Sequence, residues 1–517
     1  MTPNAVVTPH RLSARAARDV LTAGGNAVDA AVAAVAAQGV VAPETCGVGG
    51  DLFALIHGPG WERPRALNSS GRAGSRVSAE AIRQAGASEI PDDHPAVVTV
   101  PGCVDGMETL ITSMGRLGLD EVLAPAIGYA AEGFEVSTEQ AAAFSGRSAI
   151  YSSNPAVSDF YQGGGPATRG ERVRRPDLAR VLGEVAAGGR AAFYEGAPGA
   201  DIIEAVGGLI TPEDLEAGQA EWIEPIGLSV FGLDCWTIPP NSQGYLGPAT
   251  LAAFEMLDPP DDTSDPLWWH LLIEAYRCVA WERDDLVSDP ETMALPADLM
   301  LEHSRLQRAA ATVDRERAGE WPNRIGAVGG TAYLCVADGE GLTVSIIQSN
   351  YRGLGSPFGA RRSGFLLQDR GLGFTLTPGH PNELGPGKRP LHTLSPTLWT
   401  GDARPRWALG TRGGAVQPQL IAQMAARAMR GGLPLEEAQS APRWTIRDFG
   451  PSSRPMPFLE PDTPDAVVRG LETRGHKVTV VDGPQQGWGP VSIIELDGDE
   501  RWAAADPRVD TAEALVF

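Results

Sequence analysis

A threonine follows two glycines at a point where the sequence predicts the start of a strand. In "GAVGGTAYLCVADGEGLTVSIIQSN", residues 326–350, Thr331 comes directly after Gly329 and Gly330. The alternation predicts a loop, a strand, a turn at "DGEG" and a second strand. A threonine beside a strand is often only a β-branched residue in its preferred place. The question is whether this hydroxyl also does chemistry.

A neutral threonine hydroxyl is a weak nucleophile and needs an adjacent base. If the threonine is the first residue of a chain, its own α-amino group, with a pKa of about 8, can be that base. Thr331 is internal, so the Gly330–Thr331 bond must break first, and the threonine hydroxyl can attack the preceding carbonyl itself. Glycine allows strained dihedral angles and leaves that carbonyl open. This pattern suggests self-cleavage that produces an N-terminal nucleophile.

Acyl transfer also needs hydrogen-bond donors for the oxyanion that develops. The stretch "LGTRGGAVQPQ", residues 409–419, offers the backbone N–H groups of Gly413 and Gly414 before an expected helix. The structural alternative is a simple turn between a strand and a helix.

The bulk composition excludes several function classes. The chain has 517 residues and a net charge of −23, from 65 acidic and 42 basic residues, so nucleic acid and anionic membranes are poor partners. No apolar run has the length of a signal peptide or membrane span. The 5 cysteines are scattered, which predicts unpaired thiols in a reducing cytoplasm. The 8 histidines show no HxH or HExxH spacing, so we expect no metal or cofactor.

The elements that must position Thr331 change in character along the chain. Residues 14–41 predict two Ala-rich helices broken at Gly24-Gly25, with Asn26 as a cap. Strands are expected at 52–57 and 229–237, and strands and turns dominate from 331 onward. Together these predict an α/β fold with sheet packed on sheet and helices outside. Further helices are expected at 104–116, 119–132, 176–187, 199–206, 248–257, 267–283, 416–430 and 463–474.

Motifs along nearly the whole chain resemble the γ-glutamyltranspeptidase family of N-terminal-nucleophile hydrolases. They include "GGNAVDAAVAA", "GVGGDLFALI", "PPNSQG", "GGTAYLCVAD", "PGKRPLHTLSPT" and "GTRGGAVQPQ", in order. The resemblance implies an αββα four-layer sandwich from an autoprocessed precursor. Its large subunit, 1–330, and small subunit, 331–517, would stay associated, with a homodimer possible. Thr331 falls on the family's nucleophile, and Gly413 and Gly414 fall on its oxyanion glycines. Ser349 falls where the family has a second threonine, whose hydroxyl lies beside the nucleophile.

The pocket departs from the family's glutamate-binding pattern. Tyr351 replaces an asparagine that touches the substrate α-amino group, and Arg370 stands in the segment that usually carries an acid. His392 and Thr393 replace two serines, and Arg72 lies two residues beyond the usual arginine position. An ammonium group beside Arg370 would be repelled, whereas a carboxylate or oxalyl group would be attracted. The resemblance therefore favours the hydrolase branch that contains the oxamate amidohydrolases.

Four functions remain open from the sequence. The first is a self-cleaving amidohydrolase for a small, carboxylate-bearing, oxamate-like amide. The second is a γ-glutamyltransferase or glutathione hydrolase. The third is a secondary-metabolism enzyme that cuts an oxalyl-type carbon–carbon bond, and the fourth is a precursor that never cleaves and has no activity.

Overall fold

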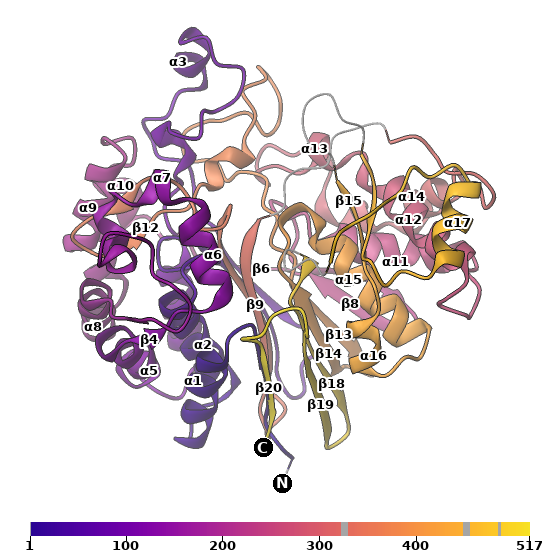
Figure 1. Cartoon of the computed structure of the whole chain (residues 1–517), viewed down its shortest axis with the longest axis horizontal. Coiled ribbons are helices and arrows are strands. Elements are labelled where there is room, and N and C mark those ends of the chain that lie inside the picture. Colours follow the sequence, from indigo (N-terminus) through magenta and orange to yellow (C-terminus); the bar gives the residue numbers. More distant parts are fainter. Residues whose placement is uncertain (1, 322–328, 448–454, 484–487) are drawn as a thin grey trace.

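The computed structural model describes residues 2–321, 329–447, 455–483 and 488–517. Two antiparallel sheets stack face to face, and helices cover both outer faces (Figure 1). This is the four-layer αββα sandwich that the family resemblance implied. In the described part, no helix is long and apolar enough to span a membrane.

The larger sheet interleaves strands from both sides of Thr331. Its order is β20 (Glu513–Val516), β1 (Ala5–Thr8), β9 (Gly330–Ala337), β10 (Thr343–Tyr351), β2 (Asp51–His57), β3 (Arg65–Ser69) and β6 (Glu221–Ile223). The second sheet has the order β19 (Glu500–Ala505), β18 (Val491–Asp497), β14 (Arg404–Thr411), β13 (Thr397–Gly401), β8 (Leu233–Thr237) and β7 (Ile226–Val230). Two small sheets pair β4 (Phe134–Glu135) with β5 (Arg172–Val173) and β11 (Gly359–Ala360) with β12 (Phe365–Leu366). A third has the order β15 (Trp444–Arg447), β16 (Met456–Leu459) and β17 (Thr479–Val480).

One helical layer covers the larger sheet. It contains α1 (Arg11–Thr22), α2 (Ala27–Val41), α4 (Cys103–Met114), α5 (Leu119–Glu132), α8 (Pro176–Tyr194) and α9 (Ala197–Ala205). Shorter helices on this side are α3 (Ala79–Gln84), α6 (Thr138–Gly146), α7 (Ser148–Tyr151) and α10 (Pro212–Glu216), with the 3-10 turns η1 (Pro95–Val97) and η2 (Pro155–Tyr161).

The second helical layer covers the smaller sheet. It contains α11 (Leu246–Met256), α12 (Pro266–Ala280), α14 (His303–Ala310), α15 (Gln417–Ala425), α16 (Leu435–Ser440) and α17 (Asp465–Thr473). Short segments are α13 (Arg283–Leu286), η3 (Ala297–Leu301), η4 (Arg370–Gly373), η5 (Gly414–Val416) and the π-helical η6 (Ala426–Arg430).

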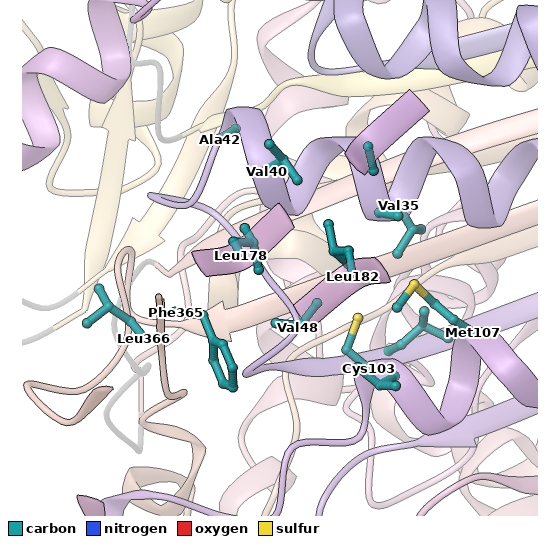
Figure 2. Close-up of a cluster of buried hydrophobic side chains, with 14 of the residues drawn as sticks. Val35, Val40, Ala42, Val48, Cys103, Met107, Leu178, Leu182, Phe365 and Leu366 are labelled. Carbon is teal, nitrogen blue, oxygen red and sulfur yellow. The ribbon is translucent and has the colours of Figure 1, made fainter. Parts of the chain in front are cut away.

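Helix α2 shows how the sequence builds the outer layer. The Asn26 side chain caps it by accepting hydrogen bonds from the N–H groups of Val28 and Asp29, and the Asp29 carboxylate accepts from the Asn26 N–H. Every residue of α2 is buried, and its alanines let the helix approach the sheet and neighbouring helices closely. Figure 2 shows the apolar cluster that results, where side chains from α2, α4, α8 and β12 meet.

A separate apolar core fills the space between the two sheets. Phe53, Tyr333 and Ile347 from the larger sheet belong to the same cluster as Leu398 and Ile494 from the smaller one. Leu334 and Val336 belong instead to the cluster under the helices. Because alternate residues of a strand face opposite ways, Thr331 shares the face of Tyr333 and points toward the second sheet.

Several predicted elements are confirmed, and one is wrong. The helices of the Ala-rich segment, helix α5 and the β9–β10 hairpin lie where the sequence placed them. The expected single strand at 229–237 is instead the hairpin β7–β8, because Phe231 and Gly232 form a turn with φ of 55° and 76°. The 5 cysteines are free and buried, as expected.

Candidate active site

Thr331 lies at the start of β9, buried between the two sheets with 1% of its surface exposed. Strand β10 runs antiparallel beside it, and their pairing is irregular between Gln348 and Tyr351. This irregularity re-aims the end of β10 next to Gly330. Tyr351 completes it with φ of 77°, an uncommon conformation for a residue with a side chain, and one found often at functional sites.

Two hydroxyl groups converge on the carbonyl oxygen of Gly330. The Oγ1 of Thr331 donates to it at 2.7 Å, and the Oγ of Ser349 donates to it at 2.6 Å. The two hydroxyl oxygens are 3.3 Å apart. The N–H of Tyr351 donates to Ser349 Oγ at 2.7 Å, which orients the serine hydroxyl toward the carbonyl. These two donors polarise the Gly330 carbonyl group, whose oxygen would carry the negative charge that develops during attack.

The two glycines before Thr331 leave no room for side chains. A Cβ at Gly329 would lie 2.6 Å from the Tyr351 carbonyl oxygen, and one at Gly330 would lie 2.6 Å from the Gly353 Cα. That same Cβ would lie 3.0 Å from the Glu44 carbonyl oxygen. Backbone from two segments, residues 351–353 and Glu44, thus packs directly around the bond.

Gly413 and Gly414 approach the same point from the second sheet, at the end of β14. Their φ values are 131° and 58°, which favour glycine. The Gly414 Cα lies 3.5 Å from the position that a Gly329 Cβ would occupy. Among the described residues, neither N–H group of these two glycines has an acceptor. Gln243 holds the turn in place, because its Nε2 donates to the carbonyl of Gly414 at 3.1 Å.

The sequence analysis missed Gln417, which also reaches the nucleophile. Its Nε2 is 3.5 Å from Thr331 Oγ1, and its Oε1 accepts from the Ser395 N–H at 3.0 Å. The signal was available, because Gln417 follows "GTRGGAV" directly in the quoted stretch. Its side chain is fully buried.

Arg370 presents an unpaired cation beside this cluster. Its guanidinium lies over the ring of Tyr351, 4.2 Å from the centroid, and its Nη1 donates to Thr393 Oγ1 at 3.1 Å. Its Nε and Nη2 are buried and have no hydrogen-bond partner among the residues that the structure describes. Burial lowers the pKa of Arg370, while the nearby carboxylate of Asp51 raises it. An arginine remains charged in proteins, so these two N–H groups can receive an anionic ligand atom.

Asp51 is a second residue that the sequence analysis missed. It pairs with Ser349 across β2 and β10, and its Oδ1 accepts from the Gly71 N–H at 2.8 Å and from Gln368 Nε2 at 2.8 Å. Its Oδ2 lies 3.0 Å from His392 Nε2. The motif "GGDLFAL" carried this residue, but its partners are distant in sequence.

His392 and Arg72, both proposed as substrate ligands, already have protein partners. His392 is fully buried, its Nε2 faces Asp51, and its Nδ1 accepts from the Leu394 N–H at 3.3 Å. Burial and the Arg370 charge lower the pKa of His392 to about 3, so the ring is neutral and fixed in orientation.

Arg72 makes its contacts away from the Thr331 cluster. Its guanidinium pairs with Glu221 at 2.9 Å and with Asp289 at 3.5 Å, and it donates to the Gly387 carbonyl at 3.1 Å. Tyr351, Arg370 and Thr393 are therefore linked by contacts to the Thr331 and Ser349 hydroxyls. His392 instead contacts Asp51, and Arg72 lies in an ion-pair cluster.

A comparison with known families and proteins gives consistent matches over the full length. The gamma-glutamyltranspeptidase family profile matches residues 13–516. The "Glutathione hydrolase-like YwrD proenzyme" of Bacillus subtilis is 34% identical over 99% of this chain and 98% of its own length. The "Oxamate amidohydrolase proenzyme" of Klebsiella pneumoniae is 34% identical over 98% of this chain and 97% of its own.

Solved structures agree with the fold. The crystal structure of cephalosporin acylase from Bacillus halodurans superimposes with a TM-score of 0.91 at 31% identity, and covers 99% of this chain and 96% of that one. The similarity therefore spans both sheets and both helical layers rather than one segment.

Proposed function

The chain belongs to the gamma-glutamyltranspeptidase family, and from this premise we propose that it is a self-processing amidohydrolase whose nucleophile is Thr331. The observation that carries the proposal is the convergence of the Thr331 and Ser349 hydroxyls on the Gly330 carbonyl oxygen. Its substrate would be an amide of a small carboxylate-bearing, oxamate-like acid.

Processing uses the geometry of the intact chain. Thr331 Oγ1 attacks the Gly330 carbonyl carbon, and Ser349 Oγ–H stabilises the oxyanion that forms. The hydroxyl proton of Thr331 passes to the leaving nitrogen as the C–N bond breaks, which leaves an ester between Gly330 and Thr331 Oγ1 and a free α-amino group on Thr331. Water hydrolyses the ester to a Gly330 carboxylate and restores the threonine hydroxyl. The products are the subunits 1–330 and 331–517.

Turnover would reuse the same atoms. The freed α-amino group takes the proton from Thr331 Oγ1 as the hydroxyl attacks the substrate amide. The N–H groups of Gly413 and Gly414, which have no acceptor in the described structure, would stabilise the substrate oxyanion. The amine leaves with a proton, and water then releases the acid from acyl-Thr331.

Arg370 supports the substrate class. Within the described part of the chain, two of its N–H-bearing nitrogens are buried without a partner, so a ligand carboxylate would satisfy these open donors. A γ-glutamyl group would bring an α-ammonium as well. The nearby carboxylate of Asp51 is already surrounded by donors from Gly71, Gln368 and His392, which leaves little capacity to pair with that ammonium.

A genuine glutathione hydrolase is the second candidate, because the relative named "Glutathione hydrolase-like YwrD proenzyme" is as similar in sequence as the oxamate amidohydrolase. Purified protein incubated with oxamate and with a γ-glutamyl anilide distinguishes the two. We expect ammonia release from oxamate or a related small amide, and little coloured amine from the anilide. Strong anilide turnover would exclude the proposed substrate class.

The processing step has its own readout. We expect two bands on a denaturing gel, and a small-subunit N-terminus that begins with the Thr331 sequence Thr-Ala-Tyr-Leu. Active protein that remains a single uncut band would overturn the mechanism.

A further inference from the structure

Two histidines and a glutamate meet in the second helical layer, outside the active site. His270 and Glu274 lie one turn apart on α12, and His476 follows α17. All three are buried, and their potential ligand atoms lie within 4.8 Å of one another. We propose that His270, Glu274 and His476 bind one divalent transition-metal ion, with zinc best suited to this set of two imidazoles and a carboxylate.

The arrangement of the rings fits a metal site. His270 Nε2 faces the Asp314 carbonyl oxygen at 2.8 Å, and a histidine ligand commonly donates its second ring N–H in this way. This contact places the proton on Nε2 and leaves Nδ1 unprotonated, as a ligand nitrogen must be. His270 Nδ1 lies 2.8 Å from His476 Nε2.

The cluster requires only a small adjustment to accept the ion. Without metal, His476 Nε2–H donates to His270 Nδ1, so a proton lies between the two nitrogens. Bonds of about 2.0–2.1 Å in a tetrahedral zinc site place two nitrogens about 3.3 Å apart. The rings must therefore separate by roughly 0.5 Å, and His476 must carry its proton on Nδ1.

Glu274 supplies charge and is itself held in place. Its Oε2 accepts from Arg277 Nε at 2.6 Å, and its Oε1 accepts from the Gly319 N–H at 3.2 Å, as expected for a ligand carboxylate supported by outer hydrogen bonds. The positive charges of Arg277 and Arg474 act on the cluster and oppose a cation there, and the Glu274 carboxylate offsets one of these two charges.

The position of the cluster gives the ion a structural purpose. His270, Glu274 and Asp314 precede Thr331, whereas His476 follows it. After the proposed cleavage, the metal would join the large and small subunits through ligands from both. This consequence rests on cleavage, whereas metal binding itself does not.

Cobalt(II) tests the site, because tetrahedral cobalt absorbs visible light and replaces zinc readily. Protein treated with a chelator and then titrated with cobalt should bind one ion per chain and develop this absorption. His476→Ala and Glu274→Gln should lose it. His303→Ala, which changes an exposed histidine on α14, should keep it. No absorption in the wild type, or equal absorption in His476→Ala, would overturn the proposal.

A second measurement leaves the three proposed ligands unchanged, so it holds even where a variant of the cluster fails to fold. Zinc-loaded wild type should give an X-ray absorption spectrum of two imidazole nitrogens with oxygen ligands. A shell of oxygen alone, or one that includes sulfur, would overturn the assignment. The uncut Thr331→Ala protein should give the same spectrum, which separates failure of this site from failure of the proposed processing.

Discussion

Ser349 Oγ lies 2.6 Å from the carbonyl oxygen of Gly330, the residue on the other side of the bond from Thr331. The serine thus contacts the acyl group rather than the nucleophile alone. It comes from β10, whereas Gly330 begins β9, and the irregular pairing of the two strands brings them together. Its role in the uncut chain would be to stabilise the oxyanion of self-cleavage.

Removal of the Ser349 hydroxyl should therefore slow processing. Loss of one oxyanion donor lowers the rate by a factor of about 10²–10³. We expect Ser349→Ala to be cleaved more slowly by that factor, and therefore to accumulate as precursor. A time course of the two bands after rapid purification measures it. Ser345→Ala is the matched control, because Ser345 lies on the same strand face but bonds to Tyr333 and Thr397. Equal cleavage rates in Ser349→Ala and wild type would contradict the assigned role.

Thr331 itself should be indispensable for both steps. Thr331→Ala lacks the attacking oxygen, so we expect one uncut band and no hydrolysis of any amide. Thr331→Ser keeps a hydroxyl and should still be cut, more slowly. Mass spectrometry of the intact protein reads the outcome, and cleavage of the alanine variant at the same bond would point to an external protease.

Arg370 should decide how well the substrate carboxylate binds. Removing one partner of a buried charge pair costs at least about 2 kcal/mol, so we expect Arg370→Met to raise KM for a carboxylate-bearing amide at least about 30-fold. Arg352→Met is the control, since Arg352 lies near the same ring but pairs with exposed Asp92. For a substrate analogue with a neutral amide in place of the carboxylate, both substitutions should leave KM nearly unchanged. An unchanged KM in Arg370→Met would remove Arg370 from the pocket.

Glu44 should make the protein less stable as the pH rises. Burial first, and then the nearby Glu139 carboxylate, raise the pKa of Glu44 to about 8. Its folded pKa exceeds its unfolded one, so stability is fully present below about pH 4.5 and declines as the pH rises toward 8. Glu44→Gln should remove a penalty on the order of 2–5 kcal/mol at pH 8. Denaturant midpoints at pH 5 and pH 8 measure this, and an equal difference between variant and wild type at both values would refute it.

Local pattern was enough to predict the elements that carry the nucleophile. The cap at Asn26 and the alternation around Thr331 depend on residues within a few positions, so both were visible in the sequence. The roles of the pocket arginines were not. Arg72 and Arg370 both looked available, yet Arg72 pairs with Glu221 and Asp289 while Arg370 is left with open donors. Such differences arise from side chains brought together by the fold, which no local spacing encodes.

The interleaving of strands in the larger sheet determines whether the cleaved protein can refold. Strands β9 and β10 lie between β1 and β2, which belong to the chain before Thr331. Once the bond is cut as proposed, no continuous backbone remains to guide these strands back between their neighbours. The precursor would act as a folding template used a single time. Inactivation by heat should then be irreversible, and its apparent Tm should depend on scan rate.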